Sequence, residues 1–201
     1  DAAVGVAYGT MLGDNFYLIG GITDTNGDPS RPFDGFENFV NEGEYFKSIE
    51  LGYTSSQERI IFDNYHMTLW HKDEQDEAGV PDGWGLAFSA SRYVGDKLMP
   101  FVRGAYTDDG GSLLQRSLSA GLGYQPQSMD GLLGVGINWG EPNETTFGKG
   151  LAEQQAIEVF YRADLGKHVA VTGDVQYIQD PALNPAEDRI WMLNLRARFV
   201  F

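Results

Sequence analysis

The chain contains no cysteine, so it can form neither disulfide bonds nor thiolate metal sites. It has no apolar run approaching the roughly 18 residues that a transmembrane helix needs. Basic residues are also few, because 14 Lys and Arg stand against 29 Asp and Glu, for a net charge of −15. This balance argues against a nucleic-acid-binding surface, which needs a basic face. It equally argues against attachment to an anionic leaflet through a basic patch.

What the chain does have is a clear period of two, most visible in residues 191–201. Alternate positions there are all apolar, namely Trp191, Leu193, Leu195, Ala197, Phe199 and Phe201. The intervening positions include Arg196 and Arg198. Such alternation indicates a strand between two environments, and this combination is typical of a transmembrane β-barrel strand with lipid outside and water inside. A solvated β-sandwich could contain the same strand, so the other segments must decide.

The same pattern predicts eleven strands and little helix. The strands are expected at residues 2–12, 15–23, 44–54, 60–71, 84–93, 98–106, 113–124, 131–140, 154–164, 169–178 and 189–201. Their lengths are near the roughly 9–11 residues with which a tilted strand crosses hydrocarbon. Only residues 33–43 suggest a short helical turn, inside a loop. The expected fold class is therefore all-β, an antiparallel up-and-down transmembrane β-barrel.

The links between these strands alternate in length. The short links are Gly13-Asp14, 55–59, 95–97, 125–130 and Gly166-Lys167, and the longer ones are 24–43, 72–83, 107–112, 141–153 and 179–188. Links 107–112 and 125–130 are equal in length. Outer-membrane barrels have short turns on one side and long loops on the other.

An odd number of strands is unusual, because single-chain bacterial barrels normally close with an even number. We therefore expect residues 1–201 to form a single outer-membrane β-barrel domain that is the C-terminal part of a longer barrel, unless one strand is miscounted. An open sheet edge would leave backbone hydrogen-bonding groups unpaired in lipid.

Assigning the more apolar positions of each strand to lipid turns the charged side chains inward. A lipid-facing Arg at mid-membrane costs about 2–4 kcal/mol, and Arg103, Arg162, Arg196 and Arg198 all avoid that position. Lys47, Arg92 and Arg116 fit less well and lie near strand ends, from which long side chains reach the interface. The candidate pore-lining, substrate-binding residues are Arg103, Glu158, Phe160, Arg162, Asp174, Gln176, Asn194, Arg196, Arg198, Glu50, His66 and Trp70.

These inward residues allow two interpretations. They can be salt-bridged groups that stabilise the wall, or they can form a path for sugars, in which aromatic rings stack on pyranose faces and guanidinium or carboxylate groups bind hydroxyls. An outer-membrane hydrolase is an alternative, with His66 beside Asp63 or Asp73 as its only candidate pair. A soluble β-barrel that binds a ligand is another. The sequence shows no catalytic residue, metal site or cofactor motif.

At this point several segments resemble the carbohydrate-selective porin family, OprB. They are Phe16-Tyr17, Asp24 to Pro29, Tyr65 to His71, Gly79 to Gly85, Pro100 to Gly104, Glu158 to Arg162, Asp174 to Pro181, and the closing strand with Arg196 and Arg198. The resemblance implies a 16-stranded barrel in the outer membrane of Gram-negative bacteria that passes small sugars such as glucose. It makes this chain a channel and not an enzyme. The implied partners are small sugars and outer-membrane lipid and lipopolysaccharide, with a possible homo-oligomer and no nucleic acid.

Overall fold

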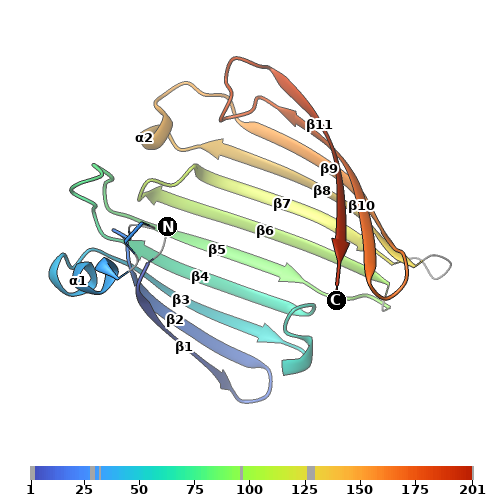
Figure 1. Cartoon of the computed structure of the whole chain (residues 1–201), viewed down its shortest axis with the longest axis horizontal. Helices are drawn as coiled ribbons and strands as arrows, with labels where there is room; N and C mark the ends of the chain where they lie inside the picture. The colour runs from blue at the N-terminus through green and yellow to red at the C-terminus, as the bar shows by residue number, and fades with distance from the viewer. Residues whose placement is uncertain (1–2, 28–29, 32, 96, 126–129, 201) are drawn as a thin grey trace.

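The computed structural model describes residues 3–27, 30–31, 33–95, 97–125 and 130–200. They form one antiparallel sheet of eleven strands, in which strands that follow one another in sequence are neighbours in the sheet (Figure 1). This confirms the all-β, up-and-down prediction. The strands are β1 (Gly5–Leu12), β2 (Phe16–Asp24), β3 (Tyr45–Thr54), β4 (Asn64–Lys72), β5 (Gly83–Ser91), β6 (Leu98–Asp109), β7 (Leu114–Tyr124), β8 (Gly131–Pro142), β9 (Gln154–Asp164), β10 (Val169–Gln179) and β11 (Arg189–Phe199).

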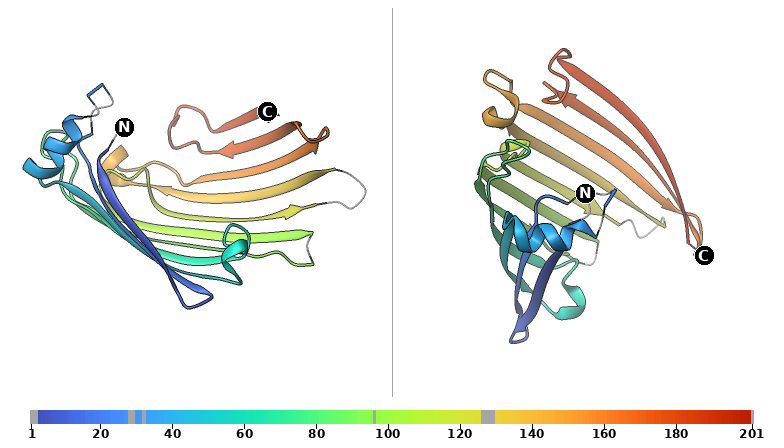
Figure 2. Two further views of the ribbon diagram at one scale, coloured as in Figure 1. Left: turned by 60° about the horizontal axis from the view of Figure 1, so that its bottom comes forward. Right: turned by 60° about the vertical axis from the view of Figure 1, so that its left-hand side comes forward.

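The sheet curls into a trough, as the turned views in Figure 2 show. Its edges are β1 and β11, which do not pair with each other in the described part of the chain. Because β-strands twist in one direction, a long sheet with one apolar face curls instead of lying flat. Consecutive strands run in opposite directions. The links that follow β1, β3, β5, β7 and β9 therefore lie at one end of the trough, and the links that follow β2, β4, β6, β8 and β10 lie at the other.

Three short helices lie in the described parts of the links. The helix α1 (Asp34–Asn41) falls within the expected 33–43 turn, and its Phe39 ring contacts the Tyr45 ring at 5.0 Å. The helix α2 (Glu144–Phe147) is capped by Asn143, whose Oδ1 accepts a hydrogen bond from the Thr145 amide at 2.9 Å. No helix in the described ranges is both long and apolar enough to span a bilayer.

The third helix, η1 (Gln57–Arg59), accounts for the main difference from the expected boundaries. The β4 strand begins at Asn64, not at residue 60, because residues 59–63 form a compact turn. There the Arg59 carbonyl accepts hydrogen bonds from the amides of both Phe62 and Asp63 at 2.8 Å. Link 55–63 is consequently longer than link 110–113 at the opposite end, so the two ends differ less in loop length than the sequence suggested.

An ion pair holds this turn together. Arg59 Nε donates to Asp63 Oδ2 at 2.7 Å, the Ser55 hydroxyl donates to the same oxygen at 2.8 Å, and the Tyr93 amide donates to Asp63 Oδ1 at 2.9 Å. The Arg59 guanidinium is the main cause that lowers the pKa of Asp63 to about 2, against the opposing effect of burial. The turn therefore depends on an ionised Asp63.

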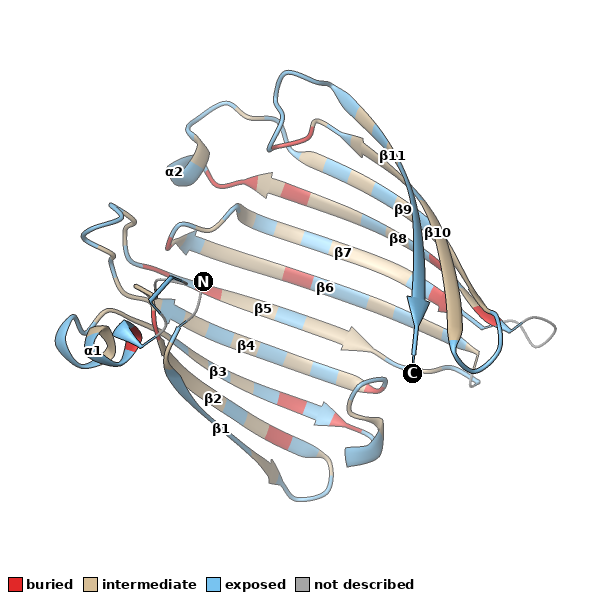
Figure 3. Cartoon of the chain, viewed as in Figure 1, coloured by how far each residue is buried: buried red, intermediate tan, exposed pale blue. Residues whose placement is uncertain are grey.

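The sheet does not enclose a dry hydrophobic core. Few positions along the ribbon are buried (Figure 3). Apart from glycine and proline, the buried apolar residues in the described part of the chain are Tyr17 and Ala182. Large apolar side chains are instead exposed, among them Ile49, Met67 and Ile137. A soluble domain of this size buries most of its apolar surface, so this distribution does not support the soluble β-barrel alternative.

Most exposed apolar side chains of the strands lie on the convex face of the trough, where aromatic residues gather near both ends. Near the short turns, the Phe16 and Tyr53 rings lie 5.2 Å apart and the Tyr53 and Tyr65 rings 6.1 Å apart. At the opposite end the pairs are Trp84 with Tyr106 at 5.6 Å and Tyr177 with Trp191 at 4.8 Å. Two aromatic belts flanking an apolar band are typical of a surface between two membrane interfaces.

From the sequence, Tyr53, Tyr93, Tyr124 and Phe201 fall near the short-turn ends of the expected strands, which predicts an aromatic belt on that side alone. The Tyr93 ring contacts the Phe62 ring at 5.5 Å, and the Tyr124 side chain is exposed. Phe201 lies outside the described residues. The second belt went unnoticed because its members are spread over β5, β6, β10 and β11, and only the register brings them to one height.

Candidate functional site

The register between strands shows which side chains share a face. One row of direct partners runs from Gly52 to His66, Ser89, Arg103, Ser119, Asn138, Ala156, Ile178 and Ile190, across β3 to β11. Directly paired residues point to the same side of a sheet, and so do residues two apart in one strand. All twelve candidate residues fall on the face of this row.

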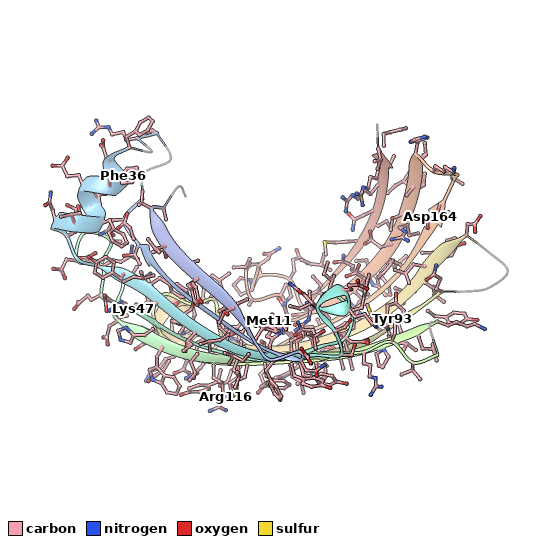
Figure 4. The ribbon with its side chains drawn as sticks, turned by 90° about the horizontal axis from the view of Figure 1, so that it is seen from below. Met11, Phe36, Lys47, Tyr93, Arg116 and Asp164 are labelled. Carbon is pink, nitrogen blue, oxygen red and sulfur yellow. The ribbon has the colours of Figure 1, made fainter. Side chains whose placement is uncertain are left out.

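That face is the concave one. Figure 4 shows Arg116 projecting from the outer, convex side of the trough. Arg116 and Ser119 are three residues apart in β7, so they point to opposite faces, which places Ser119 and its row inside. The candidate residues are therefore together on the hollow side of the sheet.

Aromatic residues on this face lie against glycines of the neighbouring strand. In four concave-face pairs the aromatic residue directly opposes a glycine, namely Tyr17 with Gly52, Trp70 with Gly85, Phe101 with Gly121 and Phe160 with Gly134. A Cβ built on Gly134 would come within 2.1 Å of the Phe160 ring, and one on Gly85 within 2.4 Å of the Trp70 ring. The rings thus cover the backbone of the next strand and present a face to the interior.

The first polar cluster lies on β2, β3 and β4. The Tyr17 hydroxyl donates to Glu50 Oε1 at 3.0 Å, and the Thr68 hydroxyl donates to Glu50 Oε2 at 2.7 Å. His66 Nδ1 is 2.7 Å from Asn64 Oδ1. Toward the long-loop end the Phe46 and Trp70 rings stack at 5.7 Å. Glu50 and His66 are therefore held in place by neutral partners.

The second polar cluster lies on β9, β10 and β11. Arg162 Nε is 3.0 Å from Asp164 Oδ1, and Arg162 Nη2 donates to Asp164 Oδ2 at 3.0 Å. The Asn194 amide donates to Asp174 Oδ1 at 2.8 Å, and the Gln176 amide donates to the same oxygen at 3.2 Å. The basic and acidic groups of this cluster are thus only partly paired with one another.

Between the clusters, the wall is lined mainly by small side chains. The concave positions of β5 to β8 include Gly85, Ala87, Ser89, Ala105, Ser117, Ser119, Gly121, Gly134 and Gly136. Arg103 stands out here, with its guanidinium 5.5 Å from the Phe101 ring centre. Small residues leave much of the middle of the trough open, and Phe101 and Arg103 of β6 are among the larger groups that a solute would meet there.

The three basic residues that fitted the face assignment less well have separate explanations. Lys47 and Arg116 lie on the convex face near the long-loop ends of their strands. Lys47 Nζ is 2.8 Å from Asp73 Oδ2, and Arg116 Nη1 is 3.4 Å from Glu141 Oε2. Arg92 follows the end of β5 and lies in a link. Each cation is therefore at a strand end, as expected for groups at an interface.

The structure does not bring His66 together with Asp63 or Asp73, the candidate pair of the hydrolase alternative. His66 contacts Asn64, whereas Asp63 binds Arg59 and Asp73 binds Lys47. Asp73 also pairs with His71, at 3.3 Å. Within the described residues, no group of three or more His, Asp or Glu side chains could hold a metal ion.

Sequence reasoning left some residues of this face out of the candidate set, including Tyr17, Asp164 and Lys167. The alternation rule could have placed Tyr17 inside, because Phe16, Leu18 and Ile22 are the more apolar positions of β2. Lys167 lies in the turn after β9, where no alternation applies.

An antiparallel sheet that is apolar on its convex face and polar on its concave face has the structure of a transmembrane β-barrel wall. Residues 63–201 match the sequence profile of the family described as carbohydrate-selective porin, OprB family. The chain therefore belongs to the OprB family.

A solved structure gives the same fold. The chain is similar to the structure described as "High pH structure of Pseudomonas putida OprB", with a TM-score of 0.67 and 14% sequence identity. The match covers 98% of this chain and 58% of that one, so this chain spans well under two thirds of the length of that protein. No curated protein sequence matches this chain significantly.

Proposed function

We propose that this chain forms the C-terminal part of the wall of an outer-membrane channel in a Gram-negative bacterium, through which small sugars such as glucose diffuse passively. The division of the sheet into an apolar convex face and a polar concave face carries the proposal, and family membership supports it. The chemistry needs no covalent step, because a wet interior lowers the barrier that hydrocarbon presents to a polar solute.

The twelve candidate residues would bind the sugar weakly as it passes. The half-buried rings of Trp70 and Phe160 would offer stacking platforms for the apolar faces of a pyranose ring. Glu158 and Arg103 offer charged hydrogen-bonding groups for hydroxyls along the same wall. Conduction requires each such contact to remain weak, since a tight site would not release the sugar.

The convex face would contact outer-membrane lipid and lipopolysaccharide through its apolar band and its two aromatic belts. Association of several copies of the protein is a further expectation. Chemical cross-linking in native membranes would test it, since a single cross-linked species at the mass of one chain would contradict it.

Two tryptophans on opposite faces give a matched test. Trp70 lies on the concave face, whereas Trp84, on the adjacent strand β5, lies on the convex face. In planar bilayers, Trp70→Ala should weaken the block of ion current by glucose about 2- to 10-fold, as expected for loss of one aromatic contact. Trp84→Ala should leave the block unchanged.

Arg162→Ala and Arg198→Ala should alter conductance or sugar flux, because both would remove a charged group from the interior. Equal glucose block in the two tryptophan variants, together with unchanged conductance in both arginine variants, would refute the assignment of these residues to a channel lining.

A further inference from the structure

A pocket of about 390 Å³ lies on the concave face beside the short turn between β9 and β10. Its wall on one side comes from Arg162 and Asp164 of β9, and on the other from Arg196 and Arg198 of β11. Lys167 of the turn closes one end. This volume is within the range of about 300–1,000 Å³ that small-molecule sites occupy in proteins.

The register explains why a groove forms here. Thr172 of β10 pairs directly with Arg162 on one side and with Arg196 on the other. One step toward the turn, Ala170 lies in the same way between Asp164 and Arg198. Because neighbouring strands are about 4.8 Å apart, the two walls stand roughly 10 Å apart over a floor of small side chains.

The charge of this groove is opposite to that of the protein. Arg162, Lys167, Arg196 and Arg198 are four of the 14 basic residues in a chain of net charge −15, and they meet here with Asp164 as the single acidic lining residue. Asp164 pairs with Arg162. In the part of the chain that the structure describes, Lys167, Arg196 and Arg198 have no acidic partner.

Asp174, another acid on this face, forms no ion pair with them in the described part of the chain. Asp174 follows Thr172 on the same face of β10, yet its Oδ1 accepts hydrogen bonds from the amides of Asn194 and Gln176. Its partner on β11 is Asn194, and Arg196 lies one step further toward the turn. Two guanidinium groups and one ammonium therefore remain available to a ligand.

We propose that this groove binds a monosaccharide that carries one anionic group, either a carboxylate or a phosphate. Guanidinium groups bind both kinds of oxyanion through paired hydrogen bonds. The Thr172 hydroxyl on the floor of the groove and the Asp164 carboxylate in its β9 wall supply partners for sugar hydroxyls. The proposal rests on the proposed function for the arrival of sugars in the trough, but binding itself can be measured without any transport.

Calorimetric titration of the detergent-solubilised protein tests the proposal with four probes. These are glucuronate, glucose 6-phosphate, neutral glucose, and inorganic phosphate as an anion without a sugar. Glucuronate, glucose 6-phosphate or both should bind at least about fivefold more tightly than glucose and than inorganic phosphate, and this preference should shrink as salt screens the charges.

Substitutions then locate the site. Lys167→Gln and Arg198→Gln should each weaken binding of the charged sugars about three- to fivefold, as expected for one partly solvated charge. Arg189→Gln is the matched control, because Arg189 lies on the same strand at its opposite end and on its convex face. It should leave all four affinities unchanged. Lys167 lies in a turn, so its variant keeps the test valid if the strand variant folds poorly.

Equal affinity for both charged sugars and glucose would overturn the proposal, and so would a loss in Arg189→Gln equal to that in the other two variants. Inorganic phosphate binding as tightly as the charged sugars would overturn the assignment to a sugar ligand. Failure of the proposed function has a different signature, which is the absence of glucose-dependent block in bilayers whatever these affinities are.

Discussion

Replacing Gly134 with alanine would test whether the Phe160 ring needs the bare backbone beside it. The new Cβ would lie 2.1 Å from Cε1 and 2.3 Å from Cζ of Phe160, whereas ordinary contacts begin at 3.4 Å. The ring edge must therefore move by about 1.3 Å. Overpacking of this kind costs about 1–3 kcal/mol. Alanine also reduces the freedom of the unfolded chain, which offsets about 0.4–1 kcal/mol.

Gly136 is the matched control. It lies two residues along β8 on the same face, but a Cβ there meets no atom closer than 3.9 Å. Gly136→Ala should thus be neutral or slightly stabilising. We expect Gly134→Ala to be about 1–3 kcal/mol less stable than Gly136→Ala, which corresponds to a melting temperature about 2–12 °C lower for a chain of this length.

Thermal unfolding of the detergent-solubilised protein, followed by the loss of the folded band in gel electrophoresis, measures this difference. In the background of Phe160→Ala the penalty at Gly134 should disappear, because the ring that clashes is gone. Equal melting temperatures for Gly134→Ala and Gly136→Ala, or a penalty that persists without the Phe160 ring, would refute the packing argument.

Three further predictions concern the turn, the convex face and a loop. Asp63 has a folded-state pKa of about 2, below its ordinary value of 3.8, so its contribution to stability is complete above about pH 4 and is lost as pH falls toward 2. Asp63→Asn should therefore reduce the loss of stability between about pH 4 and pH 2 in a pH–stability curve. An unchanged loss of stability in this range would contradict the prediction. Ile137→Arg should destabilise the membrane-inserted protein by about 2–4 kcal/mol in a denaturant titration, whereas Asn138→Arg, on the concave face, should cost much less, and equal costs would mean that the faces are reversed. Asn143→Ala removes the cap of α2 and should cost about 0.5–2 kcal/mol of local stability, seen as faster hydrogen exchange in residues 143–153.

The strands and their two faces could be predicted because side-chain alternation is local. Alternation over a few residues is enough to place Arg162 and Arg196 on one side and Val159 and Leu195 on the other. The prediction was less accurate at the start of β4, because the apolar pair Ile60 and Ile61 continues the strand pattern. In the structure the hydrogen bonds of Arg59 and Asp63 close a turn there instead.

The candidate site was predictable as a set of residues but not as an arrangement. No pattern within one strand shows that Phe160 lies over Gly134, or that Asp174 is occupied by Asn194 and Gln176. These contacts depend on the register between strands, which is set by hydrogen bonds between residues well separated in the chain. The aromatic belt at the long-loop end was missed for the same reason.

The amino-acid sequence alone was sufficient to define an all-β chain with a lipid-compatible face and a charged face, because a period of two follows directly from strand geometry. Only the tertiary structure decided which charges meet and which remain unpaired. It aligned Arg162, Thr172 and Arg196 in one row and left the small Thr172 side chain between two guanidinium groups. Alternation sets the side of the sheet on which a residue lies, whereas pairing between strands sets its neighbours.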